Sequence, residues 1–345
     1  MPLPAQRPPR AVCVGESMVV LVPHRTGPLE HAEEFRRYAG GAESNVAGAL
    51  AGLGVDTSWV SRLGDDGFGR YLRADIADRG VDVSAVEIDP LRPTGLYVKE
   101  TGDGTGDLPA GRSRMHYYRA GSAASAMSPD LVSGGPARDL LDRADLVHVT
   151  GITAGISDSA TDLLWHLLSR PRPSTTVSFD LNWRPGLWHG RDPAVLGRLC
   201  ALADVVLLGA DEAAEVLGSS SPARLRELLP NPDMLVVKND AHDAIAVDRT
   251  GAEVVVPALD VEVVEPVGAG DAFAAGYLAG TLRDLPVAHR LRLGHLCAAR
   301  ALAVPGDHGV PPSPATITAL LARADDEWAR TRVSRLGVDT PPVAS

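Results

Sequence analysis

Cysteine is scarce in this sequence, and the three that it contains, Cys13, Cys200 and Cys297, lie far apart in apolar stretches. Because this spacing provides neither a disulfide framework nor a paired thiol motif, we expect reduced, buried thiols. No apolar run approaches the length of about 20 residues that a membrane-spanning helix needs. The first residues, MPLPAQRPPR, lack the apolar core of a secretory signal. These absences predict a cytoplasmic protein without a membrane partner.

Positive charge is also in deficit, with 33 lysines and arginines against 44 aspartates and glutamates and a formal net charge of -11. A nucleic-acid or anionic-membrane partner would need a basic face, which this balance disfavours. Hydrophobic residues make up 45% of the 345 positions, which is enough for a large core. Length alone permits one large α/β domain or two smaller ones.

Several common catalytic motifs are missing. The chain has no G-x-x-x-x-G-K-[ST] loop, which argues against a P-loop kinase, and no H-E-x-x-H, C-x-x-C or G-x-S-x-G motif. Its ten histidines show no metal-ligand spacing. The stretch GDDGFG, which begins at Gly64, lacks the strand–turn–helix placement of a dinucleotide fingerprint. The chemistry must therefore be sought in other stretches.

Short apolar strands alternate with amphipathic helical stretches over most of the chain. The predicted strands include AVCVGES, DTSWVSRLG, ADLVHVTG, TTVSFDLN, ADVVLLG and DMLVVKN. Buried apolar strands that alternate with helices are typical of a doubly wound, mainly parallel α/β sheet flanked by helices. We expect a single domain over residues 11–330, with loose tails at residues 1–10 and 331–345.

Two segments interrupt this alternation. Residues 17–39 and 92–120 have the pattern of hairpin-like strand pairs with long polar tips and no helix to cover them. Strands that leave an α/β core often form a small lid over a ligand cleft, although an ordinary β-meander at a sheet edge has the same pattern. Since exposed strand edges often pair between subunits, we expect a homo-oligomer that assembles through the lid strands.

The stretch EPVGAGDAFAAGYLAG, residues 265–280, places glycines directly before an aspartate at a predicted helix start. Gly268 and Gly270 leave backbone N–H groups open to an oxyanion, and the helix dipole adds to the attraction. Asp271 can accept a proton from a nearby hydroxyl group. Phosphoryl transfer needs both parts, because donors stabilise the phosphoryl charge while a carboxylate orients and deprotonates the nucleophile. The alternative is a tight turn in which Asp271 caps the helix.

A second glycine turn occurs in YAGGAESNVAGALAGLG, residues 38–54. Gly40 and Gly41 form a turn with little side-chain bulk, and Ser44 and Asn45 offer side-chain hydrogen bonds at a helix start. This combination suits a polyhydroxylated ligand that lies against the backbone. An N-terminal helix cap after a turn is an equally good interpretation of this stretch alone.

The two glycine stretches, in this order and with RLGDDGFGRYL between them, resemble the ribokinase-like (PfkB) family of sugar kinases over about residues 11–320. The resemblance implies a doubly wound α/β domain with a small β lid over the sugar, ATP as the phosphoryl donor, and Mg²⁺. It implies that Asp271 is the base on the sugar hydroxyl. It also implies that the backbone of Gly268, Ala269 and Gly270 forms the anion hole.

Two arginine-containing segments bear on the identity of the sugar. YYRAGSAAS places Tyr117 and Arg119 at the base of the second hairpin. SFDLNWRPGLW places Asn182 and Arg184 at the carboxyl end of a strand, where ligands of open α/β sheets bind. Arginine matches a carboxylate bidentately, so two arginines at one cleft favour an acidic sugar. The alternative is that either arginine pairs with a protein carboxylate such as Asp180.

Both segments resemble those of 2-keto-3-deoxygluconate kinases within the family. The resemblance implies ATP-dependent phosphorylation of that sugar acid to its 6-phosphate. It assigns the substrate contacts to Gly41, Asn45, Tyr97, Tyr117, Arg119, Asn182 and Arg184. The alternatives are another sugar kinase of the family, such as a fructokinase or ribokinase, and a non-catalytic sugar-binding protein on the same scaffold.

The chain departs from the family pattern in its nucleotide and metal motifs. In GADE, Gly209 replaces the asparagine of N-x-x-E, which leaves Glu212 to hold magnesium through water. In KNDAHD, Lys238 remains from K-x-G-x-x-G, while Asp240 and Asp243 replace the glycines. Residues 265–267, EPV, replace the usual D-T, so potassium dependence is not expected. The adenine base is expected near residues 295–311, and the phosphates near Lys238, Gly268 and Gly270.

Overall fold

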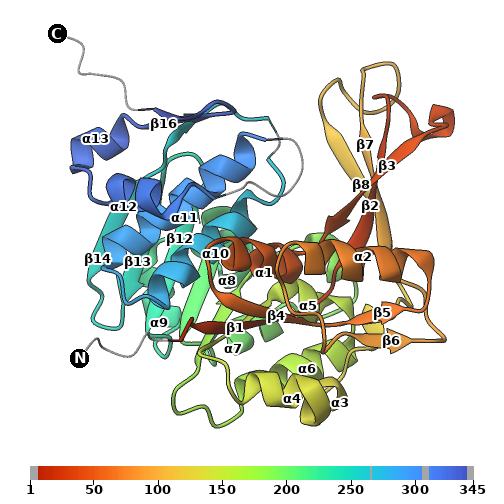
Figure 1. The fold of residues 1–345 in the computed structure, drawn as a ribbon, viewed down its shortest axis with the longest axis horizontal. Helices are drawn as coiled ribbons and strands as arrows, with labels where there is room; N and C mark the ends of the chain where they lie inside the picture. Colours follow the sequence, from red (N-terminus) through yellow and green to blue (C-terminus); the bar gives the residue numbers. More distant parts are fainter. Residues whose placement is uncertain (1–6, 265, 305–310, 340–345) are drawn as a thin grey trace.

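The computed structural model describes residues 7–264, 266–304 and 311–339, most of which surround a sheet of eight strands (Figure 1). Neighbouring strands are parallel over most of the sheet, and the two strands at one edge are antiparallel to their neighbours. The expected doubly wound, mainly parallel sheet is therefore confirmed. In spatial order the strands are β14 (Glu253–Pro257), β13 (Asp243–Asp248), β12 (Met234–Asn239), β11 (Val205–Gly209), β10 (Thr176–Asp180), β9 (Leu146–Thr150), β1 (Arg10–Val14) and β4 (Asp56–Val60).

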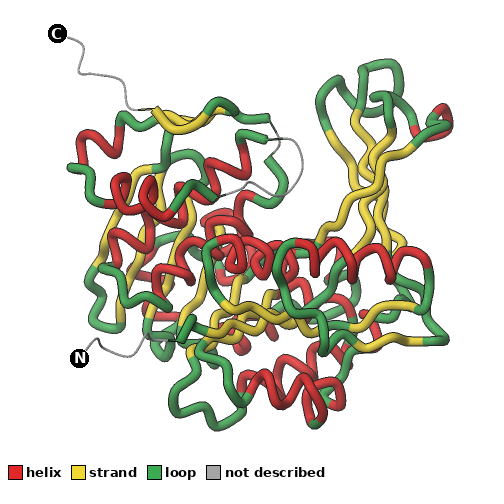
Figure 2. Tube along the Cα trace, viewed as in Figure 1, coloured by secondary structure: helices red, strands yellow, loops and turns green. Residues whose placement is uncertain are grey.

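Helices cover both faces of this sheet (Figure 2). Successive strand residues face opposite sides, so Leu207 of β11 joins one core while Val206 and Leu208 join the other. Burial on both faces explains the continuous apolar runs of the strands. One core packs against α1 (Ala42–Gly52), α2 (Gly67–Asp78), α10 (Ala269–Thr281), α11 (Val287–Leu302), α12 (Pro314–Leu321) and α13 (Asp325–Ala329). The other packs against α3 (Asp130–Ser133), α4 (Gly135–Leu141), α5 (Gly151–Ile156), α6 (Asp158–Leu168), α7 (Ala194–Cys200), α8 (Ala210–Leu217) and α9 (Pro222–Leu228).

A sheet of four strands projects from the main body and forms the lid (Figure 1). Its strands, in order, are β3 (Phe35–Gly40), β2 (Met18–Pro23), β7 (Leu96–Thr101) and β8 (Ser113–Tyr118). The two hairpin-like segments of the sequence thus join into one sheet, because β2 pairs with β7 in parallel. The outer strands β3 and β8 leave open edges within the described chain, and their pairing between subunits stays a prediction.

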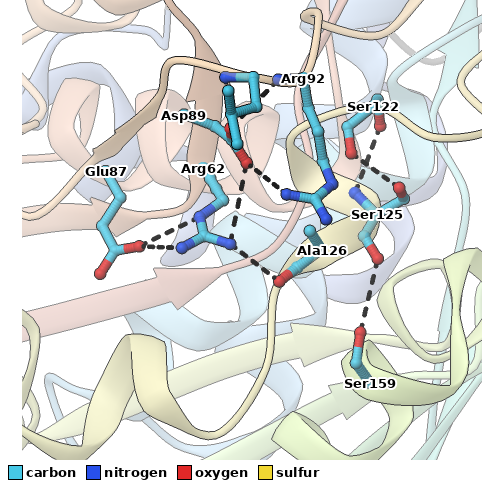
Figure 3. A network of polar contacts seen from close by, with 9 residues as sticks. Arg62, Glu87, Asp89, Arg92, Ser122, Ser125, Ala126 and Ser159 are labelled. Carbon is cyan, nitrogen blue, oxygen red and sulfur yellow. Dashed lines mark hydrogen bonds and ion pairs between the residues drawn. The ribbon is translucent and has the colours of Figure 1, made fainter.

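Polar contacts tie the root of the lid to the main body (Figure 3). The Nη2 atom of Arg62 lies 3.0 Å from Glu87 Oε2, and its Nη1 atom donates to the carbonyl of Ala126 at 3.1 Å. The carboxylate of Asp89 accepts a hydrogen bond from Arg92 at 3.1 Å. Arg92 precedes β7 and Ala126 follows β8, so the strand pair is anchored where it leaves the main body and where it returns.

Two small sheets complete the described chain, and one of them corrects the expected C-terminal tail. Residues 331–345 were expected to be loose, but β16 (Arg332–Ser334) and β17 (Gly337–Asp339) pair with each other and with β15 (Asp260–Val261). Burial of Val333, which is 1% exposed, holds this segment against the core. The other small sheet joins β5 (Arg62–Gly64) and β6 (Glu87–Asp89). Residues 1–6 and 340–345 of the expected tails lie outside the described residues.

The fold also bears on the cysteines and on membrane-spanning helices. Cys13, Cys200 and Cys297 are free and buried, as expected. None of the helices in the described ranges is both long enough and apolar enough to cross a membrane. Short 3₁₀ helices at Leu29–His31, Ala124–Ala126 and Pro185–Leu187 lie in the connections between the main elements.

Helices α10 and α11 approach each other closely, and glycine makes the approach possible. A Cβ atom on Gly276 would lie 2.5 Å from the carbonyl oxygen of Leu293 and 2.9 Å from the Cα of Gly294. The obstacle is backbone, which cannot move aside as a flexible side chain would. The small residues that follow Asp271 therefore place the start of α10, and with it the cavity described below.

We predict that Gly276→Ala lowers the free energy of unfolding by about 1–3 kcal/mol, because the added methyl group forces the two helices apart. Denaturant titration followed by circular dichroism measures the change. Gly67→Ala is the matched control, since a Cβ there meets no atom within 4 Å. Equal stability of Gly276→Ala and wild type would show that the helix pair is not tightly packed at this point.

Candidate active site

A cavity of about 840 Å³ lies at the carboxyl ends of the parallel strands, between the lid and the start of α10. Ligands of open α/β sheets bind at this edge. Of the expected site residues, Ala269 is the one that is not part of the cavity wall, although its neighbours on both sides are. The wall includes Gly41, Asn45, Tyr97, Tyr117, Arg119, Asn182, Arg184, Glu212, Lys238, Gly268, Gly270 and Asp271.

Asp271 lies in the first turn of α10, half-buried at the cavity wall. Gly268 precedes the helix with φ +80, a left-handed conformation that favours glycine. The side-chain amides of Asn45 and Asn182 donate to the two carboxylate oxygens of Asp271 at 2.9 and 3.5 Å. Burial raises the pKa of Asp271 to about 7, although the hydrogen bond from Asn45 lowers it. The carboxylate is therefore poised to take up a proton near neutral pH.

Asn182 reaches Asp271 from a left-handed turn that directly follows β10. Its φ is 41, a conformation that asparagine adopts more readily than other non-glycine residues. The side-chain carbonyl oxygens of Asn45 and Asn182 are buried, and neither has a partner in the described part of the chain. Buried polar atoms are nearly always hydrogen-bonded, so two adjacent acceptors without donors fit a ligand that carries hydroxyl groups.

An ion pair lies beside this carboxylate. Lys238, near the end of β12, donates from Nζ to Asp180 Oδ2 at 2.8 Å. Burial alone would lower the pKa of Lys238, but the carboxylates of Asp180, Glu212 and Asp271 outweigh it and raise the pKa. The lysine is therefore an ammonium at neutral pH, in contact with acidic groups on more than one side.

Both arginines expected to bind the substrate line the cavity, and each already pairs with a protein carboxylate. Arg119 pairs with Glu16, and the two side chains are 11% and 1% exposed. Arg184 pairs with Glu212 at 3.1 Å, and its side chain is 50% exposed. The alternative of an internal partner thus applies to both arginines, but not with Asp180, which binds Lys238 instead.

Some residues of the cavity wall were not among the predicted site residues. Glu16 follows β1 by two residues, so its place at the carboxyl end of a parallel strand was the available signal. Ile152, Gly155 and Ile156 come from α5, which directly follows β9, and the same signal applies. Arg191 also lines the cavity, but its side chain is held by Asp158 and no local pattern distinguishes it.

The altered nucleotide and metal motifs lie in different places. Asp240 lies in the turn between β12 and β13, and Asp243 is the first residue of β13; neither lines the cavity. The described residues hold no cluster of three or more histidine, cysteine or acidic side chains that could bind a metal. Mg²⁺ commonly uses only one or two carboxylates together with phosphates and water, and Glu212 in the wall fits that use. Glu265 of the EPV stretch and residues 305–310, part of the stretch expected near the adenine, lie outside the described residues.

Comparisons with known proteins identify the family of this chain. A family model described as pfkB family carbohydrate kinase matches residues 9–313. A 2-dehydro-3-deoxygluconokinase from Thermoproteus tenax is 35% identical, over 92% of this chain and 96% of its own length. A fructokinase from Klebsiella pneumoniae is 31% identical, over 85% of this chain and 93% of its own length.

A solved structure has the same fold. The PfkB protein from Polaromonas superposes with a TM-score of 0.76 and 33% identity, over 92% of this chain and 100% of its own. The family match spans most of the chain, and the cavity brings together the two glycine turns, the carboxylate of Asp271 and the ammonium of Lys238. The chain belongs to the pfkB family of carbohydrate kinases, and it is a sugar kinase.

Proposed function

We propose that this protein transfers the γ-phosphoryl group of ATP to 2-keto-3-deoxygluconate and forms the 6-phosphate. The observation that carries the proposal is the half-buried carboxylate of Asp271, held by two amides in a cavity that also presents arginine. The relative from Thermoproteus tenax supports it, since 2-dehydro-3-deoxygluconate is another name for this sugar acid.

In the proposed reaction, Asp271 accepts the proton of the terminal sugar hydroxyl, whose oxygen attacks the γ-phosphorus in line with the leaving oxygen. Asn45 and Asn182 hold the carboxylate toward the cavity and offer their carbonyl oxygens to sugar hydroxyls. The backbone N–H groups at Gly268, Ala269 and Gly270 face the developing phosphoryl charge. Mg²⁺ bound with ATP would neutralise part of the phosphate charge, and Glu212 is the carboxylate placed to hold it through water.

The substrate carboxylate is assigned mainly to Arg184. Arg184 is 50% exposed in its pair with Glu212, whose side chain is 17% exposed, so it can change partners at less cost than a member of a fully buried pair. Tyr97 and Tyr117, whose ring centroids lie 5.4 Å apart, bring the lid over the same cavity. A lid in contact with the sugar would exclude water and limit futile hydrolysis of ATP.

A neutral sugar such as fructose is the second candidate. Arg119 and Arg184 both have carboxylate partners, so neither requires an acidic ligand for its charge. The 31% identity with a fructokinase supports this alternative. The side-chain carbonyl oxygens of Asn45 and Asn182, which have no partner in the described residues, suit either substrate. The effect of replacing Arg184 therefore distinguishes the acidic sugar from the neutral one.

We predict that Asp271→Asn lowers kcat by about 10²–10⁴-fold, because the amide cannot accept the hydroxyl proton. Sugar binding should change little, since the side chain keeps its shape. Coupled ADP release and sugar titration calorimetry measure the two effects. Asp78→Asn, an exposed position at the end of α2, is the matched control. Turnover of Asp271→Asn near the wild-type rate would remove Asp271 from the role of base.

The raised pKa of Asp271 predicts a pH dependence of kcat/KM. The base must be deprotonated, so below its pKa of about 7 kcat/KM should fall by about tenfold per pH unit. Asn45→Ala removes a donor that lowers this pKa and should shift the acidic limb to higher pH. If the acidic limb came from the nucleotide, its pKa would be the same in that variant as in wild type. An acidic limb at the same pH in both proteins would assign it to another group.

We also predict a strong preference among sugar substrates. Wild type should phosphorylate 2-keto-3-deoxygluconate far better than fructose, ribose or gluconate in the same assay. Arg184→Ala should raise KM for the keto-deoxy acid by about 10–100-fold, as expected for loss of a charge-assisted hydrogen bond. Arg73→Ala, exposed on α2, controls for the loss of one positive charge. Efficient turnover of fructose or ribose that Arg184→Ala leaves unchanged would favour the neutral-sugar candidate.

A further inference from the structure

The first turn of α1 contains a buried glutamate that the proposed reaction does not use. Glu43 lies two positions before Asn45, and its side chain is 0% exposed. Burial of a carboxyl group is costly unless hydrogen bonds compensate for it. A glutamate at this position therefore carries a cost that some other contribution must offset.

The carboxyl group of Glu43 joins α1 to the end of β9. Its Oε1 atom accepts hydrogen bonds from the hydroxyl groups of Thr150 at 2.7 Å and Thr153 at 2.6 Å. Both threonines are 0% exposed, and Thr150 also caps α5 by accepting from the backbone N–H of Ile152. Because α1 and α5 both contribute to the cavity wall, one carboxyl group holds two parts of that wall together.

The residue that directly follows β1 leaves room for this carboxyl group. A Cβ atom added to Gly15 would lie 2.1 Å from the Cδ of Glu43, and 2.4 and 2.5 Å from its two carboxyl oxygens. These are the three nearest atoms, so the carboxyl group occupies the space that a side chain at position 15 would fill. Glycine at this position thus lets Glu43 reach the carboxyl ends of β1 and β9.

Glu43 and Asn45 point to nearly opposite sides of α1. Two positions along a helix differ by about 200° around its axis. Glu43 faces the strand ends, whereas the side-chain amide of Asn45 donates to Asp271 Oδ2 at 2.9 Å. The first turn of α1 is thus fixed to the sheet on one side and bound to the proposed base on the other. A shift of this turn would move the amide relative to Asp271.

The two hydrogen bonds need an acceptor at Glu43 rather than a negative charge. Both use Oε1, and Oε2 has no partner in the described part of the chain. Burial raises the pKa of Glu43, although the hydrogen bonds from Thr153 and Thr150 lower it. An amide has nearly the same shape, and its oxygen also accepts two hydrogen bonds, so glutamine is a fitting replacement.

On the basis of the proposed function, in which Asp271 is the base, we propose that Glu43 is a positioning residue that fixes the first turn of α1 so that Asn45 meets the carboxylate of Asp271. Glu43 is not among the residues of the cavity wall, so it acts through Asn45. A displacement of about 1 Å in an active site can lower a rate by about 100-fold, so a loosened turn would affect the reaction directly.

The test compares Glu43→Ala with Glu43→Gln in the coupled assay. Loss of the carboxyl group should lower kcat per folded molecule by about 10–100-fold, because Asn45 no longer holds Asp271 in place. Glu43→Gln keeps an acceptor for both threonines and should restore kcat to within about twofold. Affinity for ATP, measured by calorimetry, should stay within about twofold in both variants, because Glu43 acts on the sugar side of the reaction. Leu225→Ala, a buried position that does not line the cavity, controls for lowered stability alone.

Gly15→Ala displaces the carboxyl group without removing it. The added methyl group should push Glu43 away from Thr150 and Thr153, so kcat should fall about as far as in Glu43→Ala. In the Glu43→Ala background the same change meets no carboxyl group and should have little further effect. Thr153→Val removes one of the two hydrogen bonds and should lower kcat by about 2–10-fold. It carries the comparison if Glu43→Ala does not fold.

Nuclear magnetic resonance supplies a readout that needs neither sugar nor turnover. The chain has four asparagines, so protein labelled with ¹⁵N-asparagine should give four side-chain amide signals, of which Asn45→Ala assigns one. Glu43→Ala should move the signal of Asn45, and Glu43→Gln should leave it in place. This signal decides the role of Glu43 even if the keto-deoxy acid proves not to be the substrate.

A purely structural role gives different results. If Glu43 only stabilises the fold, folded Glu43→Ala should keep the wild-type kcat and an unmoved Asn45 signal, as Leu225→Ala should, and either result would overturn the proposal. The proposal also fails if Glu43→Gln is as impaired as Glu43→Ala, because the hydrogen-bond acceptor would then not be what the site requires.

Discussion

The site depends on one electrostatic constraint, which is that a carboxylate must be kept partly out of water while other acidic groups lie nearby. Burial of a charge is costly unless it is paired or hydrogen-bonded. Here Asp271 receives two amide donors, and the adjacent carboxylate of Asp180 is paired with Lys238. These groups come from α1, β10, β12 and α10, so the constraint is met only when four separate elements have taken their places. The close packing of Gly276 against α11 contributes by setting the position of α10.

The glycine turns and the strand ends could be predicted from the sequence because their signals are local. A glycine-rich turn before a helix and a polar residue after an apolar strand each lie within a few positions, and the cavity indeed gathers Gly41, Asn45, Asn182 and Asp271. The pairings could not be predicted in the same way. Glu16 and Arg119 are 103 positions apart, and Asp180 and Lys238 are 58 apart, so no periodicity connects them. The short C-terminal strands could not be predicted either, since Val333 and the partly buried Val338 are the residues that pack them against the core.

The ion pairs that Arg119 and Arg184 make with Glu16 and Glu212 differ in the free energy needed to break them. Glu16 is almost fully buried, so a ligand that took Arg119 away would leave an uncompensated buried carboxylate, and breaking such a pair costs about 3–5 kcal/mol. Arg184 is half exposed, and Glu212 keeps the backbone N–H of Gly209 as a donor if Arg184 leaves. An incoming carboxylate would therefore compete for Arg184 far more easily than for Arg119.

The Glu16–Arg119 pair also connects the lid to the main body, whether or not Arg119 contacts the sugar. Glu16 lies just before β2 and Arg119 just after β8, so their ion pair joins two roots of the lid sheet, and Ser122 adds a hydrogen bond to Glu16. The polar contacts of Arg62 and Asp89 anchor the neighbouring segments (Figure 3). Arg184, by contrast, belongs to the turn after β10. A sugar acid held there would lie beside the carboxylate of Asp271 in the main body, while Tyr97 and Tyr117 covered it from a lid whose root is anchored by these contacts.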